Sequence, residues 1–170
     1  MNDDAAAAGG PALPQGRFAG PGDFRQLVRD ALACAAREGW RELILADASF
    51  EDWPLGERAV AESLNAWSRG GRRCLLLARR YDEVVRRHAR FVQWRCTWSH
   101  IITATAVPSA EALDMPSAIW SPRWVLERRD WEQCAGYCGS EPERRVLLRE
   151  KLGEWLAKSS PAFPASTLGL

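Results

Sequence analysis

The chain has 170 residues, which is enough for one domain with a hydrophobic core of ordinary size. With 46% hydrophobic and 26% charged residues, the composition excludes a disordered or fibrous protein. The formal net charge of +1 gives no indication, by itself, of a nucleic acid or membrane partner.

The N-terminal sequence and the cysteines predict a cytoplasmic protein. The first ten residues are acidic and rich in alanine, and they lack the basic and apolar regions of a signal peptide. No apolar run approaches the ~20 residues that span a bilayer. The five cysteines are odd in number and irregularly spaced, as is typical of reduced, packed thiols. The basic residues are almost all arginine, which, together with the abundant alanine, indicates a bacterial genome of high GC content.

The chain divides into three parts. Residues 1–20 are rich in Ala, Gly and Pro and predict a disordered arm. Residues 21–158 predict a single α/β domain. Residues 159–170 form an apolar C-terminal tail, which docks either on its own domain or, as a short peptide, on another protein.

Helical and strand patterns alternate within the domain. Apolar residues spaced three and four apart predict helices over 23–38, 54–69, 82–94 and 142–157. Short apolar or β-branched runs predict strands over 42–46, 74–78 and 100–107, and shorter strands over 118–120, 124–127 and 131–137. This order predicts an α/β fold with a mostly parallel sheet that is covered by helices on both faces.

Three segments of the chain resemble a known family. They are Asp52-Trp-Pro-Leu55, His88-Ala-Arg-Phe-Val-Gln-Trp-Arg95 and Phe163-Pro-Ala-Ser-Thr-Leu-Gly-Leu170. With these segments and the order of its elements, the chain over residues 22–170 resembles an uncharacterised group of proteobacterial domains related to the phospholipase D superfamily. The resemblance implies one half of a phospholipase D-like fold. Such halves often pair in that superfamily, so the resemblance also implies a homodimer.

The catalytic motif of that superfamily is absent. Its enzymes use His-x-Lys-x4-Asp, in which the His attacks phosphorus and the Lys neutralises phosphate charge. The motif lies after the third strand, where this chain has residues 108–114 and 119–124 and neither a His nor a Lys. His88 and Arg90 come earlier, in a helical pattern, and no Asp follows at the required distance. The resemblance therefore implies the fold and argues against the activity, and we expect a protein without catalysis or cofactor.

An arginine-rich stretch is the sharpest candidate site. Nine arginines and two acidic residues lie between Arg69 and Arg95. On a helix, Arg86, Arg87, Arg90 and Trp94 share one face, which could hold phosphates and stack a base. The alternative is a solvated face in an arginine-biased proteome, whose long side chains cover apolar surface. The compositional bias favours this alternative.

Two weaker candidate sites are the acidic residues after the first strand and the two histidines. Asp47, Glu51 and Asp52 lie where oxygen ligands could hold Mg²⁺, but acidic residues are also common in loops and at helix starts. His88 lies on an apolar stripe, which favours a packed histidine, and His100 has only Cys96 near it in sequence.

Two further features concern zinc and partner surfaces. Cys134-x3-Cys138 has no second ligand pair for zinc, so we expect no metal. Nine tryptophans cannot all be fully buried in a domain of this size, and the first to consider for a partner surface are Trp94, Trp98 and Trp124.

These observations lead to three hypotheses. The first is a non-catalytic binding module for an anionic ligand, either a phosphate compound or a nucleic acid, held by Arg86, Arg87 and Arg90. The second is a protein-interaction subunit that self-associates. The third is an enzyme that uses an unrecognised pair such as Asp47 and Asp52, and it ranks last because no positioned partner or tuned group is evident.

Overall fold

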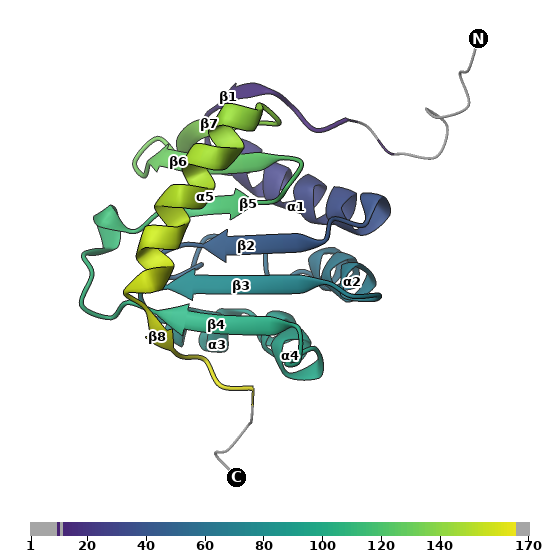
Figure 1. The fold of residues 1–170 in the computed structure, drawn as a ribbon, viewed down its shortest axis with the longest axis vertical. Coiled ribbons are helices and arrows are strands. Elements are labelled where there is room, and N and C mark those ends of the chain that lie inside the picture. Colours follow the sequence, from purple (N-terminus) through teal and green to yellow (C-terminus); the bar gives the residue numbers. More distant parts are fainter. Residues whose placement is uncertain (1–9, 11, 166–170) are drawn as a thin grey trace.

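The described part of the chain folds around one mixed sheet of eight strands (Figure 1). The structure is a computed structural model and describes residue 10 and residues 12–165. The strands are β1 (Gly16–Phe18), β2 (Glu42–Ala46), β3 (Arg73–Ala78), β4 (Ile102–Ala106), β5 (Ser117–Trp120), β6 (Val125–Asp130), β7 (Ala135–Gly139) and β8 (Ser160–Pro161). The helices are α1 (Pro21–Glu38), α2 (Arg58–Trp67), α3 (Asp82–Arg87), α4 (Ala89–Thr97) and α5 (Pro142–Ala157).

The sheet is parallel only at its centre. Its strand order is β1-β7-β6-β5-β2-β3-β4-β8, and only the β2–β3 and β3–β4 pairings are parallel. The five other pairings are antiparallel, so the prediction of a mostly parallel sheet is wrong. The reason is the length of the connections: β5, β6 and β7 follow one another through short turns, and short turns join only antiparallel strands.

Helices cover the two faces unequally. In Figure 1, α1, α2, α3 and α4 lie behind the sheet, and α5 alone crosses its front. Alternation along β2 serves both faces, because Leu43 and Leu45 join the larger core under the four helices. Ile44 and Ala46 join the smaller core, which includes Leu148 and other side chains of α5.

Most predicted elements are present, with one broken helix. The predicted helix over 142–157 is α5, and the strand over 42–46 is β2. The predicted helix over 82–94 is wrong as one element, since the chain leaves helical geometry at His88, with φ −122° and ψ 61°, and continues as α4. None of the helices in the described chain is both long and apolar enough to cross a membrane.

Both terminal segments take part in the sheet. Residues 16–18 of the expected disordered arm form β1 against β7, and residues 1–9 and 11 lie outside the described chain. In the tail, β8 pairs with β4, and the Phe163 ring stacks on Tyr81 at 4.8 Å between centroids. The tail therefore docks on its own domain as far as residue 165, and residues 166–170 lie outside the described part.

Candidate functional site

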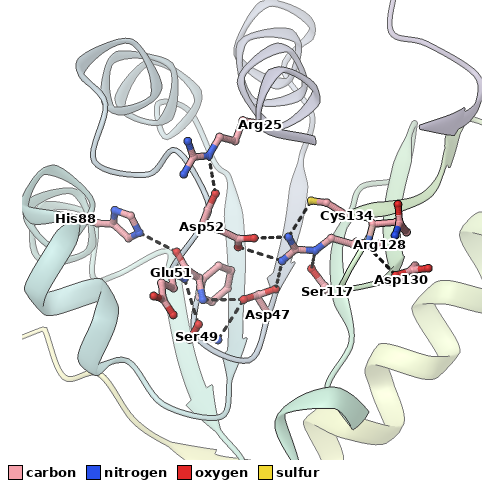
Figure 2. Close-up of polar contacts among 12 residues, drawn as sticks. Arg25, Asp47, Ser49, Glu51, Asp52, His88, Ser117, Arg128, Asp130 and Cys134 are labelled. Carbon is pink, nitrogen blue, oxygen red and sulfur yellow. Dashed lines mark hydrogen bonds and ion pairs between the residues drawn. The ribbon is translucent and has the colours of Figure 1, made fainter. Parts of the chain in front are cut away.

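The edge of the sheet where the three parallel strands end holds a polar cluster, which lies at the carboxyl end of β2 (Figure 2). We call this region the carboxyl rim; it comprises residues 47–58, 79–90, 107–117 and 128–134. Asp47 comes directly after β2, and Ser117 begins the neighbouring antiparallel strand β5. Crevices beyond the carboxyl ends of parallel strands are common ligand sites in open α/β sheets.

Arg128 on β6 is the centre of the cluster. Its Nη2 donates to Asp47 Oδ1 at 3.1 Å and to Asp52 Oδ1 at 3.1 Å, and its Nη1 donates to Asp52 Oδ2 at 2.5 Å. Its Nε donates to Ser117 Oγ at 3.1 Å, and Nη1 also lies 3.3 Å from the sulfur of Cys134. The guanidinium therefore has a partner for each of its five N–H groups.

Aromatic rings cover both faces of this guanidinium. The ring centroids of Phe24 and Trp131 each lie 4.1 Å from its central carbon. Phe24 in turn packs edge-on against Trp53 at 5.6 Å. Cation–π attraction adds to the hydrogen bonds, because the ring faces carry partial negative charge.

Burial and charge act in opposite directions on the cluster. The side chains of Arg128 and Asp47 are 0% and 1% exposed, whereas that of Asp52 is 47% exposed. Burial raises the pKa of the Asp47 carboxyl, although Arg128 and the backbone N–H groups of Ser49 and Phe50 favour its charged form. Burial opposes the charge on Arg128, but the hydrogen bond to Asp52 and the charge of Asp47 raise the pKa of the guanidinium. Arg128 therefore stays charged, and the cluster has the character of a structural ion pair.

The acidic loop does not form a magnesium site. Asp47 and Asp52 point at Arg128, whose positive charge repels a cation, while Glu51 lies 3.2 Å from Nη2 of Arg87. The three carboxylates therefore do not converge. Within the described residues, no group of three or more His, Cys, Asp or Glu side chains is placed to hold a metal ion.

The buried histidine holds the loop after β2. Nε2 of His88 lies 2.8 Å from the backbone oxygen of Phe50, a residue with φ +57° (Figure 2). A positive φ is costly for a side chain such as Phe and persists where the surroundings hold it. His88 is 6% exposed, which agrees with the packed role that the sequence favoured over catalysis.

The structure does not bring the four predicted ligand-binding residues together on one face. Arg86 pairs with Glu83 at 3.3 Å, and Arg87 pairs with Glu83 at 2.7 Å. Arg90 donates to the backbone oxygen of Gly56 at 2.8 Å. The expectation that Trp94 shares a face with them on one helix is wrong, because the helix is broken at His88 and Trp94 is buried, 1% exposed.

Two of these arginines support the loop after β2. Arg87 pairs with Glu51 and so connects α3 to that loop. Arg90 bonds Gly56 and so connects α4 to it. From the other side, Nε of Arg25 donates to the backbone oxygen of Asp52 at 3.0 Å. These contacts hold the loop in place, and they engage groups of Arg87 and Arg90 that a phosphate would otherwise contact.

The tryptophans considered for a partner surface are largely packed. The indole N–H of Trp94 donates to Ser68 Oγ at 2.8 Å, and that of Trp98 donates to Asn65 Oδ1 at 2.9 Å. Trp124 is 2% exposed and donates to the backbone oxygen of Pro14 at 3.0 Å. Their polar N–H groups therefore have internal partners.

Sequence reasoning missed Arg128, although a signal was present. In the strand Val125–Asp130, alternation places Arg128 on the same face as Leu126, which belongs to the larger core. An arginine on the inward face of a strand needs buried carboxylate partners. Asp47 and Asp52, placed after the first strand, were the available ones.

Comparisons with known proteins identify the fold class and nothing narrower. No family model matches the chain, and no curated protein matches it. Among solved structures, it is similar to TrmBL2, an archaeal chromatin protein whose structure is described as showing a novel mode of DNA binding. The TM-score is 0.63 at 12% identity, over 90% of this chain and 56% of that chain. This likeness is one of fold, and the present chain spans little more than half of its neighbour.

Proposed function

We propose that this protein is a non-catalytic binding module for an anionic ligand, either a phosphate compound or a nucleic acid. The observation that carries the proposal is a difference in net charge between the two ends of the parallel strands. We call the end where β2, β3 and β4 begin the amino rim; it comprises residues 37–42, 69–73, 99–101 and 121–124. It holds Arg37, Arg41, Arg69, Arg72, Arg73 and Arg123, with Glu38 and Glu42 as its carboxylates.

The carboxyl rim, in contrast, is electrically balanced. With Arg25 and Arg29, which reach it from α1, it has ten arginines and ten carboxylates. Many of these are paired, as Arg29 is with Glu57 at 2.7 Å and Arg87 with Glu83 at 2.7 Å. A net positive surface attracts an anion over a distance of about 10 Å at ordinary salt, and a balanced one does not. The amino rim is therefore better suited to an anionic ligand than the region of Arg86, Arg87 and Arg90.

We propose further that the scaffold is a degenerate phospholipase D-like half-domain. The sequence resemblance supports this, and so does the lack of His and Lys in residues 108–114 and 119–124, which lie around β5. The DNA binding stated for the archaeal chromatin protein supports a nucleic acid as one of the anionic ligands.

The test is binding of the purified full chain to labelled single-stranded and double-stranded oligonucleotides across a salt series. We expect binding at low salt that weakens steeply as salt rises, because phosphate contacts release counterions. Absence of binding at low salt, to the oligonucleotides and to inorganic polyphosphate alike, would overturn the proposal.

Self-association is a second candidate, favoured by exposed apolar side chains on α5. Val146 is 56% exposed and Leu147 is 64% exposed. Leu147 borders a groove of about 560 Å³ between α5 and the strands β6 and β7. Light scattering tests this function: a dimer that Val146→Gln with Leu147→Gln converts to a monomer supports it, and a monomeric wild-type protein contradicts it.

A further inference from the structure

The arginine-rich stretch of the sequence is divided between two opposite surfaces. Strand β3 carries the chain from the amino rim to the carboxyl rim, so Arg69, Arg72 and Arg73 lie at one end of the sheet and Arg79 to Arg90 at the other. The run therefore does not form one basic site. Its first part joins Arg37 and Arg41, which precede β2.

Backbone pairing places the amino-rim residues in a row. The N–H of Arg73 donates to the backbone oxygen of Arg41 at 3.0 Å, and the N–H of Cys74 donates to that of Ile101 at 2.9 Å. The turn that holds Arg123 lies beside them, because β5 pairs with β2 through Trp120 and Ile44. Neighbouring strands are ~4.8 Å apart, so the arginines from this turn, past β2, to the start of β3 extend over two strand spacings, ~10 Å.

The guanidinium groups in the middle of the row are exposed and lack strong ion pairs. Within the described chain, Arg41, Arg69 and Arg73 have no carboxylate oxygen within 4.0 Å. Glu42 lies opposite Arg73 in the β2–β3 register and offsets part of its charge, while its closest recorded partner is Arg149 at 4.0 Å. At the flank, Arg123 lies 3.9 Å from Glu38.

Arginines at this rim have an ordinary explanation, which accounts for two of them, Arg37 in the last turn of α1 and Arg72 after α2. Helices α1, α2 and α4 end here, and helix carboxyl ends carry partial negative charge that attracts cations. Arg72 serves this purpose, donating to the backbone oxygens of Trp67 and Gly70 at 3.1 Å each. Among the described residues, the contacts found for Arg41, Arg69 and Arg73 include no carbonyl oxygen at a helix end that these side chains bond.

The turn between these arginines is open to solvent. Gly70 and Gly71 have φ of +78° and +77°, and a Cβ built on either would have no atom within 4 Å. Glycine at such a turn lets a ligand approach the backbone closely. A small phosphate compound is usually enclosed in a concave pocket, whereas an open row of cations suits a polymer.

We propose, as a deepening of the proposed function and resting on it, that the amino rim binds the phosphate backbone of a nucleic acid through Arg41, Arg69 and Arg73. Arg37 and Arg123 flank the contact. A row of arginines ~10 Å long covers about three phosphates of one strand at 3.4 Å per nucleotide. The contacts reach phosphates and not base edges, so binding is independent of nucleotide sequence.

The test compares two triple variants of equal charge change in the full chain. One is Arg41→Gln/Arg69→Gln/Arg73→Gln at the amino rim, and the other is Arg80→Gln/Arg86→Gln/Arg90→Gln at the carboxyl rim. For a labelled 20-base-pair duplex, we expect the amino-rim variant to bind about 100-fold more weakly at moderate salt, with a salt slope smaller by roughly 3. The carboxyl-rim variant is expected to stay within about threefold of wild type.

A conservative variant separates charge from folding. Arg41→Lys/Arg69→Lys/Arg73→Lys keeps the three charges and is expected to retain binding within a few-fold. Circular dichroism is expected to be unchanged in all three variants, and urea unfolding in the two amino-rim variants.

The outcomes distinguish this inference from the function on which it rests. If wild type binds neither the duplex nor polyphosphate, the proposed function fails. If wild type binds the duplex and the carboxyl-rim variant is the one that loses it, the function stands and the amino rim is overturned. Full displacement of the duplex by stoichiometric pyrophosphate would contradict a polymeric ligand and favour a small phosphate compound.

Discussion

Arg128 joins segments that are far apart in the sequence. Its partners come from the loop after β2, from the start of β5 and from the turn before β7, and the ring that covers one of its faces comes from α1. The guanidinium thereby connects the parallel half of the sheet to the antiparallel half. A buried ion pair contributes little over an apolar replacement of the whole cluster, but loss of one partner leaves a buried charge without compensation.

Replacement of Arg128 is therefore expected to be severe. Arg128→Met leaves Asp47, 1% exposed, without its cation, and we expect the free energy of unfolding to fall by about 3–5 kcal/mol. Urea denaturation measures the change. Arg129→Met is the matched control on the same strand, since that side chain is 64% exposed, and we expect less than about 1 kcal/mol.

The loss of stability expected for Arg128→Met depends on pH in a predictable way. Burial already raises the pKa of Asp47, and removal of Arg128 raises it further. A carboxyl whose folded-state pKa is raised destabilises the fold while ionised, so protonation relieves the penalty. We expect the gap between variant and wild type to narrow as pH falls toward 4, and a gap that widens would show that Asp47 is not the group left unpaired.

The pKa of the Glu57 carboxyl is shifted in the opposite direction to that of Asp47. Its hydrogen bond from Arg29 lowers the pKa of Glu57 below the ordinary 4.5, so its contribution is present above that pH and is lost as pH falls through the lowered value. Because its side chain is 42% exposed, we expect Glu57→Gln to cost less than about 1 kcal/mol near neutral pH and nothing in acid. The exposed Glu62→Gln, 3.8 Å from Arg58, is the control and should match wild type at every pH.

At the scale of elements, local patterns predicted positions well and interruptions poorly. Helix α1 could be located from the spacing of its apolar residues, such as Phe24, Leu27 and Val28, and from Gly39, which ends it. These signals lie within or next to the helix itself. The break between α3 and α4 depends on a bond from His88 to Phe50, 38 residues away, and no local pattern reports such a partner. For the same reason the local pattern of residues 82–94 predicts one continuous helix where the structure has two.

The β6–β7 pairing depends on a residue without a side chain. Gly136 lies opposite Arg128, and a Cβ there would lie 1.9 Å from the backbone oxygen of Glu127. We expect Gly136→Ala to separate the strands, displace Arg128 and cost about 3 kcal/mol, measured by thermal and urea unfolding. Gly22→Ala is the control: nothing lies within 4 Å of its Cβ position, and we expect no change or a gain of less than about 1 kcal/mol.

At the scale of the whole molecule, strand direction decided what could be predicted. The alternation of helices and strands indicated an α/β fold, and the segments that became β2, β3 and β4 were located correctly. The antiparallel half could be anticipated only from its short connections, such as residues 121–124, and its place beside β2 depends on long-range pairing. The Asp47–Arg128 contact spans 81 residues and follows from that pairing, so it could not be located before the topology was known.

The C-terminal tail contributes to stability through Phe163. Its ring is 8% exposed, and its backbone oxygen accepts a bond from Nε of the buried Arg95 at 3.1 Å. We expect Phe163→Ala to reduce the free energy of unfolding by about 3 kcal/mol. Leu113→Ala, at a side chain that is 77% exposed, should change it by less than about 0.5 kcal/mol, and equal effects of the two would argue against docking of the tail.

The outermost strands of the sheet are its shortest, and short edge strands are expected to limit aggregation. β1 has three residues and β8 has two, one of them Pro161, so neither offers a long row of free N–H and C=O groups to another molecule. Behind them lie β7 and β4, of five residues each, whose outer backbone would be a template for strand addition if uncovered. A chain trimmed to begin at Gly20 or to end at Ser159 is therefore expected to keep its helices, by circular dichroism, and to form turbid, thioflavin-positive polymers that the full chain does not form.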